Sequence, residues 1–128
     1  MRSVMRAALC ALLAVLCTAA APACRIQASR TVVLYGIGDD PGVFLWDSRF
    51  RLRGYHAASF DEAQALLPHA LLVGPGTRAV VLSCYANFVQ PKYRLFPDDA
   101  VDVRILAGAL RGRTGWVLGG DARVLRRR

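Results

Sequence analysis

Three arginines at alternate positions form the first group of side chains whose types and spacing suit binding chemistry. Charged residues occupy every second position from Asp47 to Arg53, and this alternation predicts a strand. One face of that strand would carry Trp46, Ser48, Phe50 and Leu52, and the other would carry Asp47, Arg49, Arg51 and Arg53. Guanidinium groups about 7 Å apart on one face suit phosphate or carboxylate groups. The same charges also fit an edge strand that is protected against unwanted pairing.

Aromatic residues in and around the segment 86–99 form the second group. They are Tyr85, Phe88, Tyr93 and Phe96, with Lys92 and Arg94 among them and Trp116 expected to face them. Aromatic rings beside polar groups suit the recognition of a peptide or a sugar. The alternative is a long loop that its own aromatic side chains fasten to the protein surface. The five aromatic residues and the three arginines are the ligand-binding residues that the sequence predicts.

Two cysteines, Cys24 and Cys84, lie outside the expected leader, and their sulfurs have three alternative states. A disulfide would close a loop of about 60 residues, for which the chain-entropy model gives roughly 4 kcal/mol. Alternatively, Cys24 carries a lipid as the first residue of a bacterial lipoprotein. The tetrapeptide Ala21-Pro22-Ala23-Cys24 resembles a lipobox, although it lacks the usual leucine three residues before the cysteine. In the third state the two thiols are independent.

Residues that could catalyse a reaction or hold a metal are present, but their spacing indicates neither. His56 and His69 have no nucleophile and orienting carboxylate nearby in the sequence. Cysteine and histidine do not follow the spacing of a zinc site. Asp39-Asp40 and Asp98-Asp99 lack the alternate positions of a calcium loop. We therefore expect a non-catalytic protein without cofactor or metal; a small exported hydrolase with Cys84 as nucleophile is the competing interpretation.

The first 23 residues have the three parts of a secretory signal peptide. Met1–Arg6 carries two arginines, Ala7–Cys17 is an apolar run, and Ala21-Pro22-Ala23 resembles a cleavage site. The apolar run is short for a transmembrane helix, which needs about 20 residues. An uncleaved membrane anchor is the alternative.

Residues 24–128 have room for one small domain and are strongly basic. The chain of 128 residues contains 17 basic and 9 acidic side chains. Without Arg2 and Arg6 of the leader, fifteen basic residues remain and the net charge is +6. Such a charge favours anionic partners, for example a membrane surface or an anionic glycan. All basic residues except Lys92 are arginine, and this excess also matches the codon usage of a GC-rich genome.

Short strands separated by turns dominate the expected secondary structure. The predicted strands are Arg30–Ile37, Val43–Gly54, Thr77–Tyr85, Val101–Ala107, Arg113–Leu118 and Ala122–Leu125, and Val43–Gly54 is either one long strand or a bent pair. Turn residues 38–42 would join the first two strands into an N-terminal β-hairpin. A capping box of Ser59 and Glu62 predicts one short helix that ends before Pro68. Residues 24–71 thus supply strands and a helix, 72–125 supply further strands, and 126–128 form a basic tail.

A family resemblance rests on four motifs in the second half of the chain. They are GTRAVVL at 76–82, VDVRIL at 101–106, GRTGWV at 112–117 and, after a tight bend, DARV at 121–124. Over about residues 72–125 the chain resembles a bacterial Src-homology-3-like domain. The resemblance implies a small five-stranded β-barrel that binds cell-envelope polymers or peptides. The expected fold class is therefore mainly β, a Src-homology-3-like barrel with an N-terminal β-hairpin and one short α-helix.

These features together predict an exported, non-catalytic binding or targeting module of the bacterial cell envelope. Its expected location is periplasmic or secreted, with a lipid on Cys24 as the route to membrane anchoring. The expected partner is a cell-envelope polymer or peptide, or another envelope protein, with contact to an anionic surface and without specific nucleic-acid binding. The alternative function is a small exported inhibitor or accessory subunit that caps another envelope protein.

We expect the mature chain to begin at Cys24 or within a few residues of it. The reason is the succession of charged, apolar and small residues across residues 1–23, which signal peptidases recognise. N-terminal sequencing of the exported protein measures this directly. Recovery of exported protein that still begins at Met1 would contradict the prediction.

Overall fold

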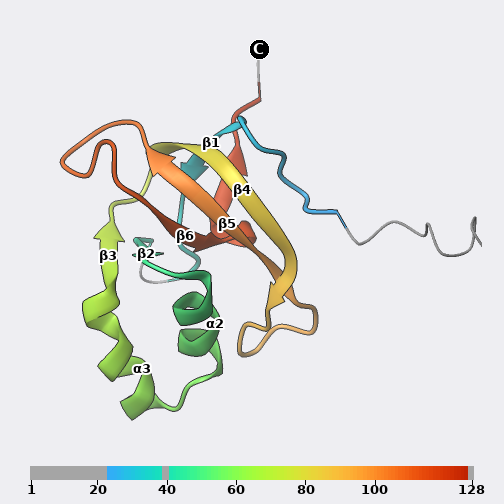
Figure 1. The fold of residues 1–128 in the computed structure, drawn as a ribbon, viewed down its shortest axis with the longest axis vertical. Helices are drawn as coiled ribbons and strands as arrows, with labels where there is room; N and C mark the ends of the chain where they lie inside the picture. The colour runs from blue at the N-terminus through green and yellow to red at the C-terminus, as the bar shows by residue number, and fades with distance from the viewer. Residues whose placement is uncertain (1–22, 39–40, 127–128) are drawn as a thin grey trace, which may run out of the picture.

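Seven antiparallel strands form one strongly curled sheet in the computed structural model, which describes residues 23–38 and 41–126 (Figure 1). The strands are β1 (Thr31–Leu34), β2 (Val43–Trp46), β3 (Ala70–Val73), β4 (Thr77–Val89), β5 (Asp98–Ile105), β6 (Thr114–Leu118) and β7 (Ala122–Val124). Their order in the sheet is β3-β2-β6-β5-β4-β1-β7. The prediction of a mainly β fold is therefore confirmed. The expected signal peptide, apart from Ala23, lies outside the described residues.

Two short α-helices pack beside the sheet, where the sequence predicted one. They are α2 (Arg49–Ala57) and α3 (Phe60–Leu66), followed by the 3-10 turn η1 (Leu67–His69). The predicted capping box is present in α3: Ser59 Oγ accepts from the Glu62 N–H, and Glu62 Oε2 accepts from the Ser59 N–H. None of the helices in the described part of the chain has the length and apolar content to cross a membrane.

The strand predicted from Trp46 to Arg53 is wrong beyond its first residue. Strand β2 ends at Trp46, and Ser48 caps helix α2 by accepting from the N–H groups of Phe50 and Arg51 at 3.1 and 3.3 Å. The alternating pattern misled because Arg49 and Arg53 also share one face of a helix at i,i+4 spacing. In that helix Arg51 instead pairs with Asp47, at 2.7 Å. The predicted row of three guanidinium groups therefore does not form.

The predicted N-terminal β-hairpin is also absent from the described sheet. β1 pairs with β4 and β7, whereas β2 pairs with β3 and β6. Three strands, β4, β5 and β6, therefore lie between β1 and β2. Turn residues can reverse the chain without bringing the flanking strands into one ladder, because strand pairing depends on contacts far along the sequence. β2 pairs with β3 instead of β1, and no signal in the sequence predicted β3.

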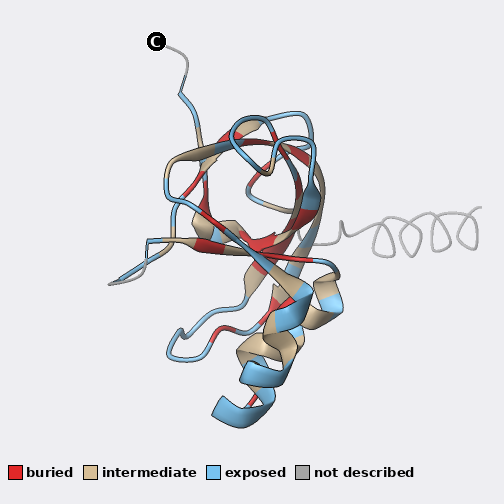
Figure 2. Ribbon diagram, turned by 90° about the vertical axis from the view of Figure 1, so that its left-hand side faces the viewer, coloured by how far each residue is buried: buried red, intermediate tan, exposed pale blue. Residues whose placement is uncertain are grey.

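The buried residues, red in Figure 2, form two clusters. Within the curl, strand β5 buries Val101, Val103 and Ile105, as its alternation predicts. On the outer face a second cluster lies under α2 and contains Trp46, Leu52, Val89, Ala100 and Leu118. Helix α2 is thus held by a buried leucine and by apolar residues from β2, β4, β5 and β6.

Gly115 permits the close crossing of β2 over β6. A Cβ atom at this position would lie 2.5 Å from Leu45 Cγ and 2.8 Å from the Trp46 carbonyl oxygen. Any side chain would therefore push the two strands apart at the point where Trp46 pairs with Trp116. Gly115 is the second glycine of the GRTGWV motif at 112–117.

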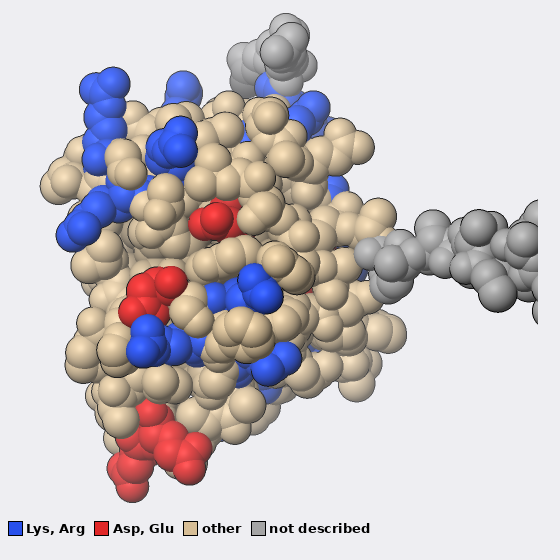
Figure 3. Space-filling view, viewed as in Figure 1, with Lys and Arg blue, Asp and Glu red and all other residues tan. Residues whose placement is uncertain are grey.

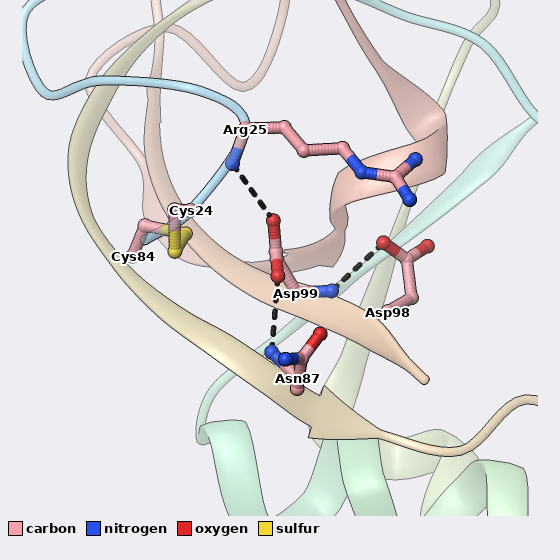
Figure 4. The surroundings of a disulfide bond; sticks show 6 residues. All are labelled: Cys24, Arg25, Cys84, Asn87, Asp98 and Asp99. Atoms are coloured by element: carbon pink, nitrogen blue, oxygen red, sulfur yellow. Dashed lines mark hydrogen bonds between the residues drawn. A yellow bond between two sulfur atoms is a disulfide. The ribbon is translucent and has the colours of Figure 1, made fainter. Parts of the chain in front are cut away.

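A disulfide joins Cys24 to Cys84, with a Cα–Cα distance of 6.3 Å (Figure 4). Of the three predicted states of these sulfurs, the structure contains the disulfide. In this state Cys24 cannot carry a lipid, and neither cysteine is a free thiol. Beside it, the buried carboxylate of Asp99 accepts from the N–H groups of Arg25 and Asn87 at 3.1 and 3.0 Å. Each of these donors lies close in sequence to one of the two cysteines, so Asp99 holds both ends of the disulfide in place.

Replacing both cysteines, as Cys24→Ser with Cys84→Ser, should lower the free energy of unfolding by roughly 4 kcal/mol, because the bond closes a long loop. Urea denaturation of the two proteins measures this difference. Thiol labelling of the unfolded, unreduced wild-type protein should find neither cysteine reactive. Two labelled thiols in residues 24–128 would show that the protein does not form the bond.

Candidate functional site

Two arginines and four aromatic rings meet on the outer face of the sheet beside α2. We call this set the arginine–aromatic cluster; it consists of Arg49, Phe50 and Arg53 from α2, Tyr85 and Phe88 from β4, and Trp116 from β6. Five of these six residues are ones that the sequence predicted as ligand-binding. The structure therefore brings most of the two predicted groups together, in a helix-on-sheet arrangement that the sequence did not predict.

An irregularity in β4 places two of the rings side by side. In a regular strand, residues three apart point to opposite faces. Here Tyr85 pairs with Ala100 and Val89 with Asp98, so residues 86–88 face the single residue Asp99. Asn87 adopts a positive φ of 51° within this bulge. As a result, the ring centroids of Tyr85 and Phe88 lie 6.0 Å apart on one surface.

Both guanidinium groups lie over ring faces. The Cζ atom of Arg49 is 3.9 Å from the ring centroid of Tyr85 and 4.7 Å from that of Phe50. The Cζ atom of Arg53 is 4.5 Å from the centroid of Phe88. Cation–π contacts of this kind contribute about 0.5–2 kcal/mol each, depending on solvent exposure. They hold the two cations in fixed positions on the protein surface.

Arg49 and Arg53 form no ion pair with any acidic side chain of the described residues. In contrast, Arg51 pairs with Asp47 and Arg94 pairs with Asp98. The Nε atom of Arg49 is buried without a hydrogen-bond partner in the described part of the chain. The space-filling view shows basic side chains over α2, in the middle of one face of the molecule (Figure 3). The cluster can therefore offer charged N–H donors to an anion.

Two predicted ligand-binding residues, Tyr93 and Phe96, do not join the cluster. They lie in the loop between β4 and β5, fully and three-quarters exposed respectively, and neither contacts another aromatic ring of the described residues. Phe50, which sequence reasoning assigned to a strand face, contributes a ring instead. The signal that could have placed it was Ser48, a favoured helix N-cap residue just before Arg49.

A cavity of about 230 Å³ lies on the other side of α2 and contains two groups with shifted pKa values. Burial lowers the pKa of His56, and the nearby Arg94 and Lys92 lower it further. Burial raises the pKa of Asp121 to about 6, an effect that the nearby Asp98 strengthens and Arg94 opposes.

One group of potential metal ligands occurs among the described residues: the sulfurs of Cys24 and Cys84 and a carboxylate oxygen of Asp99 lie within 4.8 Å of one another. The disulfide uses both sulfurs, and metal binding by cysteine requires free thiolates. Asp98 has a local role, since it pairs with Arg94 and accepts from the Gly120 N–H at 3.0 Å. These groups therefore serve the fold.

Comparison with known proteins assigns no family to the chain. The chain shows no significant match to a protein-family model, a curated protein or a solved structure. The chemistry of the arginine–aromatic cluster therefore rests on its own residues and their geometry.

We expect Asp121→Asn to stabilise the protein at neutral pH and not at pH 4. With a pKa of about 6, folded Asp121 keeps a proton at pH values where the unfolded chain has already lost it. The stability that this group contributes is therefore lost as the pH rises from about 4 to 6, and asparagine, which cannot ionise, avoids that loss. The expected gain at pH 7 is about 1–2 kcal/mol.

Urea denaturation of both proteins at pH 4 and pH 7 measures this gain. Because His56 titrates in both proteins, its opposite pH dependence cancels in the difference between them. The same difference in unfolding free energy at both pH values would contradict the prediction.

Proposed function

We propose that this protein is an exported, non-catalytic binding module of the bacterial cell envelope, with the arginine–aromatic cluster as its ligand surface. One observation carries the proposal: Arg49 and Arg53 are held over aromatic rings and form no ion pair with a described acidic residue. A surface of this kind binds an anion with little loss of side-chain freedom, because the guanidinium groups are already positioned.

The expected ligand is an anionic envelope polymer or peptide. The guanidinium groups suit carboxylate or phosphate, and the rings of Phe50 and Tyr85, 55% and 43% exposed, suit an apolar or planar part of the same molecule. The net charge of +6 for residues 24–128 would increase the rate of encounter with such a polymer. The leader-like N-terminal sequence and the disulfide support a periplasmic or secreted location.

The Src-homology-3-like interpretation of residues 72–125 is part of this proposal. Two features support it: β4, β5 and β6 are neighbours in the sheet, and the 3-10 turn η2 (Gly119–Asp121) leads into β7. However, β7 pairs with β1, which lies before residue 72. The curled sheet is therefore larger than the segment that carries the resemblance.

Arg49→Gln should weaken binding to purified peptidoglycan by about tenfold or more, as expected when a central charged contact is lost. Arg49→Lys should recover only part of the affinity, because an ammonium group keeps the charge but not the planar, ring-stacked fork of donors. Cosedimentation of the protein with the polymer measures both effects.

Arg51→Gln is the matched control, because it removes the same charge from the same helix at a residue that pairs with Asp47. It should bind almost as tightly as the wild type. Equal losses of affinity in the Arg49 and Arg51 variants would show that net charge alone drives binding.

Trp116→Ala should weaken binding and also destabilise the fold, because Trp116 is half-buried and packs against Tyr85.

A second candidate function is an accessory subunit that caps another envelope protein. The loop between β4 and β5 favours it, because Tyr93, Leu95 and Phe96 are 103%, 91% and 75% exposed. Aromatic residues exposed in this way are enriched at protein interfaces. A stoichiometric complex with one envelope protein, lost in Tyr93→Ser with Phe96→Ser but kept in Arg49→Gln, would select this function over the first.

A further inference from the structure

We infer that the ligand is an acidic glycan, one of whose sugar rings sits in a groove between α2 and the end of β4 with its carboxylate on Arg53. The inference rests on the proposed function and names the class of ligand for the same surface. The groove has a volume of about 480 Å³, within the usual range for small-molecule sites, and adjoins the arginine–aromatic cluster. Its lining includes Phe50, Arg53, Asn87, Phe88, Gln90 and Pro97.

The apolar wall of the groove consists of two phenylalanine rings. Phe50 and Phe88 meet edge to face, with centroids 5.6 Å apart and an interplanar angle of 72°. Guanidinium groups lie over part of these rings, and the ring surface that they leave suits an apolar part of a ligand. The C–H face of a sugar ring is such a part, whereas a bare phosphate chain would leave this surface in water.

Arg53 supplies the charge in the groove. Its Cζ atom lies 4.5 and 5.4 Å from the centroids of Phe88 and Phe50, and the side chain is exposed. With a face of the guanidinium on a ring, its N–H edge is the part left for a ligand. A carboxylate matches that edge through two parallel hydrogen bonds.

Two amide side chains, Asn87 and Gln90, line the groove, and Gln90 can offer a hydrogen-bond acceptor. The amide nitrogen of Gln90 donates to the carbonyl oxygens of Pro91 and Arg94, at 3.3 and 2.8 Å. These bonds fix the amide and leave its oxygen as an acceptor. Sugar hydroxyl or acetamido groups can donate to such an oxygen, whereas a phosphate oxygen would be repelled. Gln90 therefore favours a hydroxylated anion over a plain one.

An extended peptide is the alternative occupant of this groove. β1 pairs with β4 only over residues 77–80, so the end of β4 beside the groove has β5 as its strand partner on one side. Peptides that bind along a sheet usually pair with a free strand edge. The rings, the guanidinium and the amides that line the groove favour a sugar, and an acidic tripeptide among the probes below tests the peptide.

Calorimetric titration of the exported, disulfide-bonded protein tests the inference with four probes. They are trigalacturonate, the matching neutral galactotriose, inorganic triphosphate and an acidic tripeptide. We expect the acidic trisaccharide to bind about tenfold or more tightly than each of the others. Arg53→Gln should remove most of this affinity, and Arg113→Gln, in the exposed turn before β6, should leave it within about twofold.

Asn87→Gly separates the sugar contact from general charge. Glycine keeps the positive φ that the bulge requires, so the fold should remain, as near-ultraviolet circular dichroism can verify. We expect this variant to bind trigalacturonate more weakly and triphosphate unchanged. An unchanged affinity for trigalacturonate in Arg53→Gln, or wild-type protein that binds any other probe as tightly, would overturn the acidic-glycan inference.

The failure of the inference and the failure of the proposed function are distinguishable. If trigalacturonate does not bind but peptidoglycan does, and Arg49→Gln abolishes that binding, the inference is wrong and the proposed function stands. If neither peptidoglycan nor any of the four probes binds, both are wrong.

Discussion

The buried carboxylate of Asp99 is the interaction on which the disulfide and the arginine–aromatic cluster both depend. It accepts from the N–H groups of Arg25 and Asn87, the first beside Cys24 and the second three residues after Cys84. The bulge in β4 leaves Asn87 opposite Asp99 in place of a regular ladder partner. Without this acceptor, the Asn87 N–H in the bulge would lose its side-chain partner.

The same bulge links the stability of the fold to the candidate site. It turns Phe88 toward Tyr85, and these rings receive Arg49 and Arg53 from the helix on the outer face. The helix in turn is fixed by Leu52, which is buried against the sheet. A short helix of nine residues is unstable alone, so the position of the two guanidinium groups is determined by packing against the sheet.

Local signals in the sequence predicted the parts of the fold that neighbouring residues determine. The strand that begins near Val101 and the capping box at Ser59 are of this kind. In contrast, the predictions of a hairpin between the first two strands and of a strand through Arg53 were wrong. The hairpin failed because the order of strands in a sheet depends on residues far apart in the sequence. A run of eight alternating residues is also too short to exclude a helix that begins at a cap residue.

The candidate site was predicted as two separate groups, and only the three-dimensional fold could join them. The bulge that unites Tyr85 with Phe88 depends on a carboxylate twelve residues away from Asn87, so no local pattern reveals it. No local pattern shows where Tyr93 and Phe96 lie either. Their aromatic side chains led to the prediction that they belong to the ligand-binding group. They lie beyond the end of β4, and the loop carries them into solvent.

Burial of part of the Arg49 guanidinium costs free energy that an apolar side chain at the same position would not cost. Its Nε atom is buried without a described partner, and an unsatisfied polar atom of this kind usually costs about 1–3 kcal/mol. A methionine or leucine could pack against the same rings without that penalty. A bound anion would draw on the remaining N–H donors of the guanidinium, in a site already partly shielded from water. The cation–π contacts of Arg49 offset part of that cost, and a bound anion would offset more, which is the physical argument for the proposed ligand surface.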